Sequence, residues 1–311
     1  MAKKRNTRKR NTAARSSRLS PEEFREMVHP IAASIKQLAI SEKFLFGRGT
    51  LYLSLANAAF SRAAEFLEQC TSDRGKNYLF FSSGSLRAIT EDIIYLKRFQ
   101  TLSHDEQEDA IIFFMQSDLK RMTDAQRKFL GNNNRFAYPT PNIPDPTPPS
   151  ETIRKLKKKR VIEIATEVGL QDFYEYMYQA TSRMVHFSPS MLYRTGWGEI
   201  EATDKGRIGE ATFSTEHFSG YYEQFCAFYA AYLLRLLFIT VKNEVPYAKQ
   251  IELDFKRIHK AIILCGRWPE AVTAEEMNMK FDQSKFPGFL YSALEHVMIE
   301  EELKKEGLED I

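Results

Sequence analysis

The sequence predicts an all-α fold, a multi-helix bundle with one small β-hairpin inserted near residues 193–213. Two observations predict the helices. Helix-start signals recur along the chain as a serine or threonine three residues before a glutamate, and apolar residues repeat at the i, i+3, i+4, i+7 spacing of a helix face. A third observation predicts the hairpin, because the pattern alternates on both sides of the turn Asp204-Lys205-Gly206.

Composition limits the class of protein. The chain has 311 residues, of which 43% are hydrophobic and 27% charged, as is typical of a soluble globular protein with an extensive core. Its three cysteines, Cys70, Cys226 and Cys265, form no CxxC pair. This argues against a zinc ribbon or a disulfide framework and favours a reducing cytosol.

Membrane and export signals are weak. The N-terminus lacks an apolar secretory segment, and the longest apolar run, from Phe225 to Val241, is interrupted by Arg235. We therefore expect a buried core helix in this run, no contact with a membrane and a cytoplasmic location.

Residues 1–18 predict a disordered basic arm, because they contain eight cations and no acidic residue. The remaining chain has 36 basic against 41 acidic residues. The arm is either a contact for RNA or DNA phosphates or a solubilising tail, and the sequence favours neither. Its cations are Lys3, Lys4, Arg5, Arg8, Lys9, Arg10, Arg15 and Arg18.

Residues 19–131 are expected to form the N-terminal helices of the bundle. Ser20 and Glu23 are a capping pair at the start of the first helix, and Pro30 is predicted to interrupt or kink it. A second capping pair, Ser103 and Glu106, opens the last of these helices, which ends near Gly131. The helices between them are predicted over 50–70 and 77–99.

Residues 132–150 form a proline-rich connector, predicted to be extended. It either divides two domains or crosses the surface of one bundle, and the crossover is favoured because candidate polar residues lie on both sides of it. Its six prolines are Pro139, Pro141, Pro144, Pro146, Pro148 and Pro149.

Residues 151–305 are expected to form the C-terminal helices of the bundle, together with the hairpin at 193–213. Gly169 is predicted to end the first of them. The helices are predicted over 150–169, 170–187, 215–242, 246–264, 273–279 and 287–305.

A cluster of cations opens this half of the chain. It is either a solvated helix face or a nucleic-acid contact, to which Lys157, Lys158, Lys159 and Arg160 would contribute. The full run is Arg154, Lys155, Lys157, Lys158, Lys159 and Arg160.

Four polar residues are the candidate site. Ser182 lies one helical turn before His186, and Arg87 and Glu91 have the same spacing on an upstream helix. That upstream helix is apolar on more than one side, so it should be central, and a charged pair on a central helix needs partners. We therefore predict that the two helices touch. The four residues are either catalytic or a buried structural clamp.

These residues also carry a resemblance. Arg87-x-x-x-Glu91, followed by Ser182-x-x-x-His186 and Ser188, resembles bacterial proteins grouped as a domain of unknown function, the 5677 family, over roughly residues 45–240. The resemblance implies an all-helical fold and no established activity.

A second analogy is to HEPN-type helical ribonucleases, which use an arginine and a histidine to cut RNA without a metal. Two residues separate Arg183 from His186, where that family has four to six between its pair. Arg87 is therefore the better arginine partner for His186.

Two functions remain open. In the first, the protein is nucleic-acid-associated and cleaves RNA, with His186 as acid or base, Arg87 stabilising phosphate charge and Glu91 orienting one of them. In the second, it is a non-catalytic binding or scaffold module, and a homo-oligomer or protein partner fits either function. No cofactor or metal is predicted, because Walker, GxGxxG and GxSxG motifs and paired ExxH sequences are absent.

Overall fold

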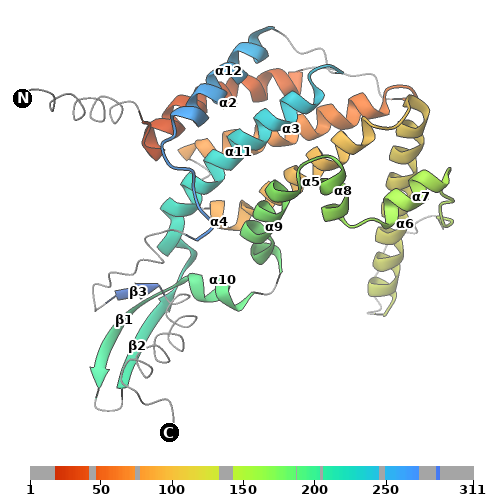
Figure 1. The fold of residues 1–311 in the computed structure, drawn as a ribbon. Coiled ribbons are helices and arrows are strands. Elements are labelled where there is room, and N and C mark those ends of the chain that lie inside the picture. Colours follow the sequence, from red (N-terminus) through yellow and green to blue (C-terminus); the bar gives the residue numbers. More distant parts are fainter. Residues whose placement is uncertain are drawn as a thin grey trace, which may run out of the picture.

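The computed structural model describes residues 18–41, 47–73, 78–132, 143–186, 188–203, 206–244, 249–272 and 285–287. The protein is all-α with a small antiparallel sheet, as predicted (Figure 1). Residues 1–17 of the basic arm and the helices expected at 273–279 and 288–305 lie outside the described residues. The helices described in the N-terminal half are α2 (Pro21–Ser41), α3 (Leu51–Thr71), α4 (Leu79–Ser82), α5 (Gly84–Phe99) and α6 (His104–Asn132).

The helices described in the C-terminal half begin after the connector. They are α7 (Glu151–Lys158), α8 (Val161–Glu167), α9 (Gln171–Val185), α10 (Pro189–Arg194), the 3₁₀ helix η2 (Thr215–Phe218), α11 (Ser219–Val241) and α12 (Lys249–Leu264).

Helix α2 runs without a break through Pro30, so the predicted interruption is wrong. The capping pair forms as expected: Ser20 N donates to Glu23 Oε2 at 2.7 Å, and Glu23 N donates to Ser20 Oγ at 3.2 Å. Pro30 is exposed, so water can satisfy the carbonyl that its missing N–H leaves free. The opposite face of α2 is held in the core by Val28 and Ile31.

The helix predicted over 77–99 is two helices, α4 and α5, that meet at Ser83. The buried Ser83 hydroxyl donates to Phe80 O at 2.7 Å, a local bond that competes with continuation of the helix. Helix α5 is central, as predicted, with Leu86, Ile89 and Ile93 fully buried.

The helix predicted over 150–169 is also two helices, α7 and α8. The break falls at Lys159 and Arg160, because the Glu163 carboxylate accepts the Arg160 N–H at 2.6 Å and starts a new helix there. Gly169 follows α8 with φ of 72°, so the predicted helix stop is confirmed.

The predicted hairpin is present as β1 (Gly196–Thr203) paired antiparallel with β2 (Gly206–Phe213). Two neighbouring elements were not predicted. Helix α10 leads into β1, and a short strand β3 (Lys285–Pro287) pairs with the other edge of β1, where a helix was expected to begin. A strand of three residues is too short to leave a periodic pattern in the sequence.

Helix α11 is the centre of the core. It packs against α3, α5 and α12, so helices from both sides of residues 133–142 share one core. Among the described helices it alone is long and apolar enough to cross a membrane, but 67% of its most apolar window is buried inside the protein. This agrees with the predicted core helix.

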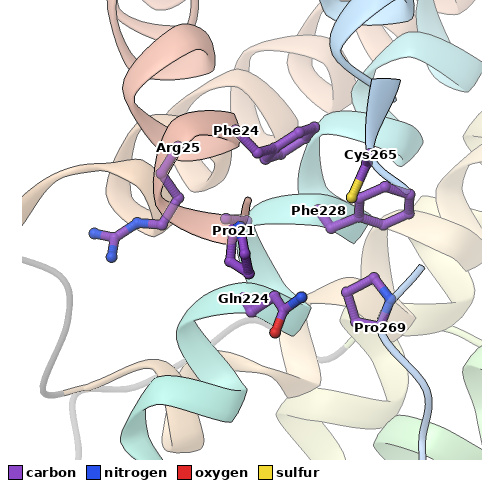
Figure 2. A pocket seen from close by; sticks show the side chains of 8 residues that line it. Pro21, Phe24, Arg25, Gln224, Phe228, Cys265 and Pro269 are labelled. Carbon is purple, nitrogen blue, oxygen red and sulfur yellow. The ribbon is translucent and has the colours of Figure 1, made fainter. Parts of the chain in front are cut away.

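Residues 269–271 are clasped by tyrosines from α9 and α11. The hydroxyls of Tyr176 and Tyr229 donate to Pro269 O at 3.0 and 2.7 Å, and Tyr221 donates to Glu270 O at 2.7 Å. Close by, the apolar rings of Phe24 and Phe228 face Cys265 in a recess that has no space for a water molecule (Figure 2). This recess is therefore closely packed and cannot hold a ligand.

Candidate functional site

Helices α5 and α9 lie side by side, which confirms the contact predicted from the sequence (Figure 1). The contact brings Arg87 to His186, with 3.2 Å between the arginine Nη1 and the imidazole Nε2. On its other side, the Arg87 Nε donates to Glu91 Oε1 at 2.8 Å. Three of the four candidate residues therefore form one hydrogen-bonded chain.

His186 is the first residue after α9, one position beyond the helix. Its backbone has φ of −121° and ψ of 158°, and its N–H donates to Ser182 O at 3.0 Å. Ser182 is buried and takes part through this backbone carbonyl. The serine side chain has no part in this bond; the helix ends because the backbone of His186 is extended, and the imidazole is exposed at that end.

An aromatic pair completes the surroundings of Arg87. The guanidinium carbon lies 4.7 Å from the centre of the Tyr178 ring, at the distance of a cation–π contact. Tyr174 lies one turn earlier on α9, with 5.7 Å between the two ring centres. From the sequence, the i, i+4 spacing of Tyr178 to Ser182 places it on the polar side of α9, whereas Tyr174 was expected on the apolar face and was not connected with the site.

The neighbours of Arg87 affect its pKa and the direction of its hydrogen bond to His186. Partial burial lowers the pKa of Arg87, but the hydrogen bond and charge of Glu91 more than offset this, so its pKa is raised. Arginine has no acceptor, so the Nε2 of His186 must accept the hydrogen bond. This arrangement requires a neutral imidazole with its proton on Nδ1.

The cluster is open to solvent. The side chains of Arg87 and Glu91 are 23% and 28% exposed, and His186 is an exposed residue. Glu91 also lines a groove of about 520 Å³, together with Tyr95 of α5 and Lys157 of α7. A sealed internal clamp would have none of this access.

The basic run of α7 and its junction with α8 is held mostly by carboxylates. Arg154 and Lys155 pair with Glu151 at 2.6 and 3.9 Å, and Lys157 pairs with Asp118 at 3.2 Å. Each of these pairs reduces the positive charge available to a phosphate.

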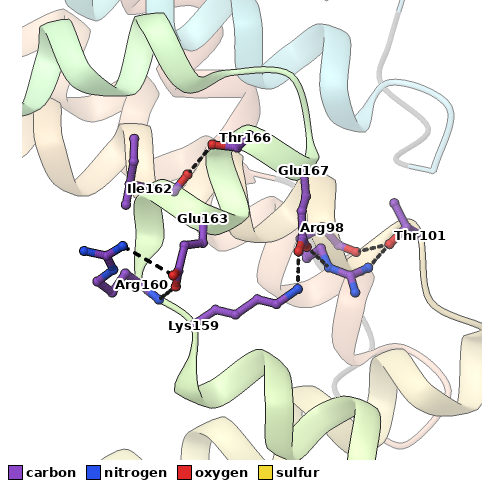
Figure 3. A network of polar contacts seen from close by, with 8 residues as sticks. All are labelled: Arg98, Thr101, Lys159, Arg160, Ile162, Glu163, Thr166 and Glu167. Carbon is purple, nitrogen blue, oxygen red and sulfur yellow. Dashed lines mark hydrogen bonds and ion pairs between the residues drawn. The ribbon is translucent and has the colours of Figure 1, made fainter.

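The junction itself holds the other two pairs. Arg160 pairs with Glu163 at 3.4 Å, and Lys159 pairs with Glu167, which also contacts Arg98 (Figure 3). Lys158 is exposed. Most of the predicted nucleic-acid contact on this run is thus engaged within the protein.

No group of three metal-binding side chains comes together within the described part of the chain. The chain matches no protein-family model, no curated protein and no solved structure. The Arg87–His186 contact is thus the main indication of function in the described structure.

Proposed function

We propose that this protein cleaves RNA at the Arg87–His186 site, by a mechanism that needs no metal. The observation that carries the proposal is the 3.2 Å contact between Arg87 and the exposed imidazole of His186. It joins a cation that binds phosphate with a group that transfers protons near neutral pH.

The reaction uses the ribose 2′-hydroxyl of the RNA as its nucleophile. The neutral His186 removes the proton from this hydroxyl, whose oxygen bonds to the adjacent phosphorus while the bond to the 5′-oxygen breaks. The leaving oxygen takes up a proton from the solvent or from the imidazolium, and the products are a 2′,3′-cyclic phosphate and a 5′-hydroxyl. No oxidant or cofactor is needed to balance the step.

Arg87 supplies the charge for this step. Its guanidinium stabilises the additional negative charge on the phosphate oxygens in the transition state. A phosphate oxygen competes for Nη1, which releases the lone pair of His186 Nε2 to act as a base. Glu91 holds the Nε side of the same guanidinium and keeps its plane fixed against the Tyr178 ring.

Access supports this function over the alternative of a non-catalytic clamp. The hydrogen bonds of a structural clamp are strengthened when water is excluded from them. Here His186 is exposed, and the groove beside Glu91 has room for a ligand. The analogy to HEPN-type ribonucleases fits the proposal through its arginine–histidine pair, whereas the resemblance to the 5677 family implies no activity. We further propose that the basic arm at residues 1–18 contacts the RNA and that the protein acts in the cytoplasm.

The test is cleavage of a fluorescent single-stranded RNA in the presence of a metal chelator. We expect the wild-type protein to produce fragments with 2′,3′-cyclic phosphate ends, and His186→Ala to lose this activity. His259→Ala is a matched control, because His259 is also an exposed histidine and lies on a different helix, α12.

A substrate with a single 2′-deoxy nucleotide at the cleaved position separates this enzyme from a contaminant that uses water. That substrate should remain whole. Cleavage that persists in His186→Ala, or no cleavage by the wild type, would overturn the proposal. A loss of thermal stability in His186→Ala without any activity to lose would favour the clamp instead.

A further inference from the structure

The groove of about 520 Å³ begins at the carboxylate that holds Arg87. Arg87, Glu91 and Tyr95 follow one another at i, i+4 spacing along α5, and the last two line the groove. From Arg87 to Tyr95 the helix rises about 12 Å. One nucleotide reaches about as far from its phosphate to the far edge of its base, so a nucleotide with its phosphate at Arg87 can place its base in the groove.

Much of the lining of this groove is aromatic. The ring centre of Tyr95 lies 6.2 Å from that of Phe99 and 5.8 Å from that of Phe114. Lys157 lies over one face of Phe114, with its Nζ 4.3 Å from the ring centre. Tyr95 is half-buried, so part of its ring borders the open space of the groove. Flat aromatic surfaces of this kind fit the face of a nucleobase.

Two polar groups of the groove have hydrogen-bonding capacity to spare. Asp118 of α6 is held through its Oδ1, which lies 3.2 Å from both Lys157 and Arg121, and among the described residues no donor reaches its Oδ2. The Tyr95 hydroxyl makes no hydrogen bond to any described residue. Burial, followed by the charges of Glu91 and Asp118, raises the pKa of Tyr95, so this hydroxyl keeps its proton at neutral pH. The groove therefore offers one oriented acceptor and one donor.

From this arrangement we infer that the groove binds a guanine base of the RNA, with Asp118 accepting its N1–H and 2-amino groups and Tyr95 donating to its 6-oxygen. The inference rests on the proposed function, because it places this base beside the phosphate at Arg87. Guanine presents two adjacent donors that one carboxylate accepts together. Adenine would turn an acceptor nitrogen toward Asp118, and uracil and cytosine each have one donor group on this edge.

The carboxylates of the groove remain compatible with RNA because each of them is paired with a cation of the protein. Asp92 pairs with Arg62 of α3, and Asp118 pairs with Lys157, as Glu91 does with Arg87. These pairs reduce the repulsion between the groove and the phosphates of a bound strand. In this arrangement Lys157 serves the RNA indirectly, by fixing the orientation of Asp118.

The test is the binding of 2′-deoxy trinucleotides, which lack the attacking hydroxyl and cannot be cleaved. Their middle base is guanine, hypoxanthine or adenine between two uracils, and hypoxanthine lacks only the 2-amino group of guanine. With the wild-type protein, fluorescence anisotropy should give a dissociation constant about ten-fold higher for the adenine probe than for the guanine probe, with hypoxanthine between them.

Asp118→Asn should reduce this preference for guanine to about two-fold or less, because the amide cannot accept both donors. Asp124→Asn is the matched control, since Asp124 is an ion-paired aspartate of α6 outside the groove, and it should leave the preference unchanged. Tyr95→Phe keeps the ring, so it should weaken binding of the guanine and hypoxanthine probes and leave that of the adenine probe unchanged.

Equal affinities of the wild type for the three probes would overturn the inference, as would a preference for guanine that Asp118→Asn leaves intact. A protein that cuts RNA without this preference would contradict the inference alone. A protein that prefers guanine but cuts no RNA would contradict only the proposed function.

Discussion

Helix α5 carries two arginine–glutamate clusters, and they differ in what else holds the arginine. Near its end, Arg98 forms an ion pair with Glu167 at 3.3 Å, and the same carboxylate is held by Lys159. Near its start, Arg87 bonds to Glu91 and to a neutral imidazole nitrogen.

The difference lies in how easily each arginine can be released. A carboxylate shared by two cations is a strong acceptor, whereas an imidazole nitrogen carries no charge and a phosphate can replace it. The Arg98 cluster is suited to fix α8 against α5. The Arg87 cluster is suited to exchange its partner for a ligand.

The largest expected effect tests the difference between the two arginines directly. Arg87→Ala should lower the rate of RNA cleavage by about 100- to 1000-fold, because phosphate charge in the transition state loses its stabilising cation. Arg98→Ala should leave the rate within about two-fold of the wild type once both proteins are measured well below their melting temperatures, because Arg98 pairs with Glu167 and contacts neither Arg87 nor His186. Equal losses in the two variants would show that Arg87 is also only structural.

Raising the pH tests the stability of the helical core that holds both clusters. Burial, followed by the charge of Glu244, raises the pKa of Tyr52, which donates to Leu96 O on α5 at 3.4 Å; burial likewise raises the pKa of Tyr229. In the unfolded chain both phenols lose their protons near pH 10, while the folded chain retains them. The contribution of these two phenols to the free energy of unfolding is therefore fully present below pH 10. Above pH 10 the free energy of unfolding should fall by about 1.4 kcal/mol per pH unit for each tyrosine.

Chemical denaturation at a series of pH values measures this loss. Tyr52→Phe should remove part of the alkaline slope, because it has no proton to lose. An unchanged slope in this variant would mean that Tyr52 ionises freely in the folded state.

Glu91→Gln sharpens the comparison at the Arg87 cluster. The amide can still accept a hydrogen bond from Nε, but it no longer provides a charge, so we expect about a ten-fold lower rate of cleavage with the KM for RNA changed less. Single-turnover kinetics separate the two quantities. A change confined to KM would place Glu91 in substrate binding rather than in the orientation of Arg87.

Glu167→Gln has the smallest expected effect. It should lower the free energy of unfolding by about 0.5–1 kcal/mol, because Glu167 is partly exposed and its pairs with Arg98 and Lys159 are screened by water. Thermal unfolding at low and high salt is the measurement, and the difference from wild type should shrink as salt is added. The rate of RNA cleavage should not change.

The helical fold and the meeting of α5 with α9 could be predicted because they rest on local signals. Capping pairs such as Ser20 with Glu23 indicate where a helix begins, and the spacing of apolar residues indicates which face is buried. Arg87 and Glu91 on a helix with several apolar faces needed partners, and this requirement pointed to His186.

The remaining features depend on the surroundings of each residue. Pro30 is tolerated within α2 because its side of the helix faces water, and the sequence does not state which side that is. The α7–α8 break depends on one hydrogen bond from Arg160 to Glu163.

The clasp on residues 269–271 has a consequence for how far this chain can be shortened. Three phenols and the Arg194 guanidinium, which donates to Ala271 O at 2.8 Å, all bind backbone carbonyls. Every residue has a backbone carbonyl, so these positions should tolerate substitution but not deletion. A protease cut after residue 272 leaves these contacts in place. A cut before residue 267 removes the carbonyls to which four side chains of α9, α10 and α11 donate.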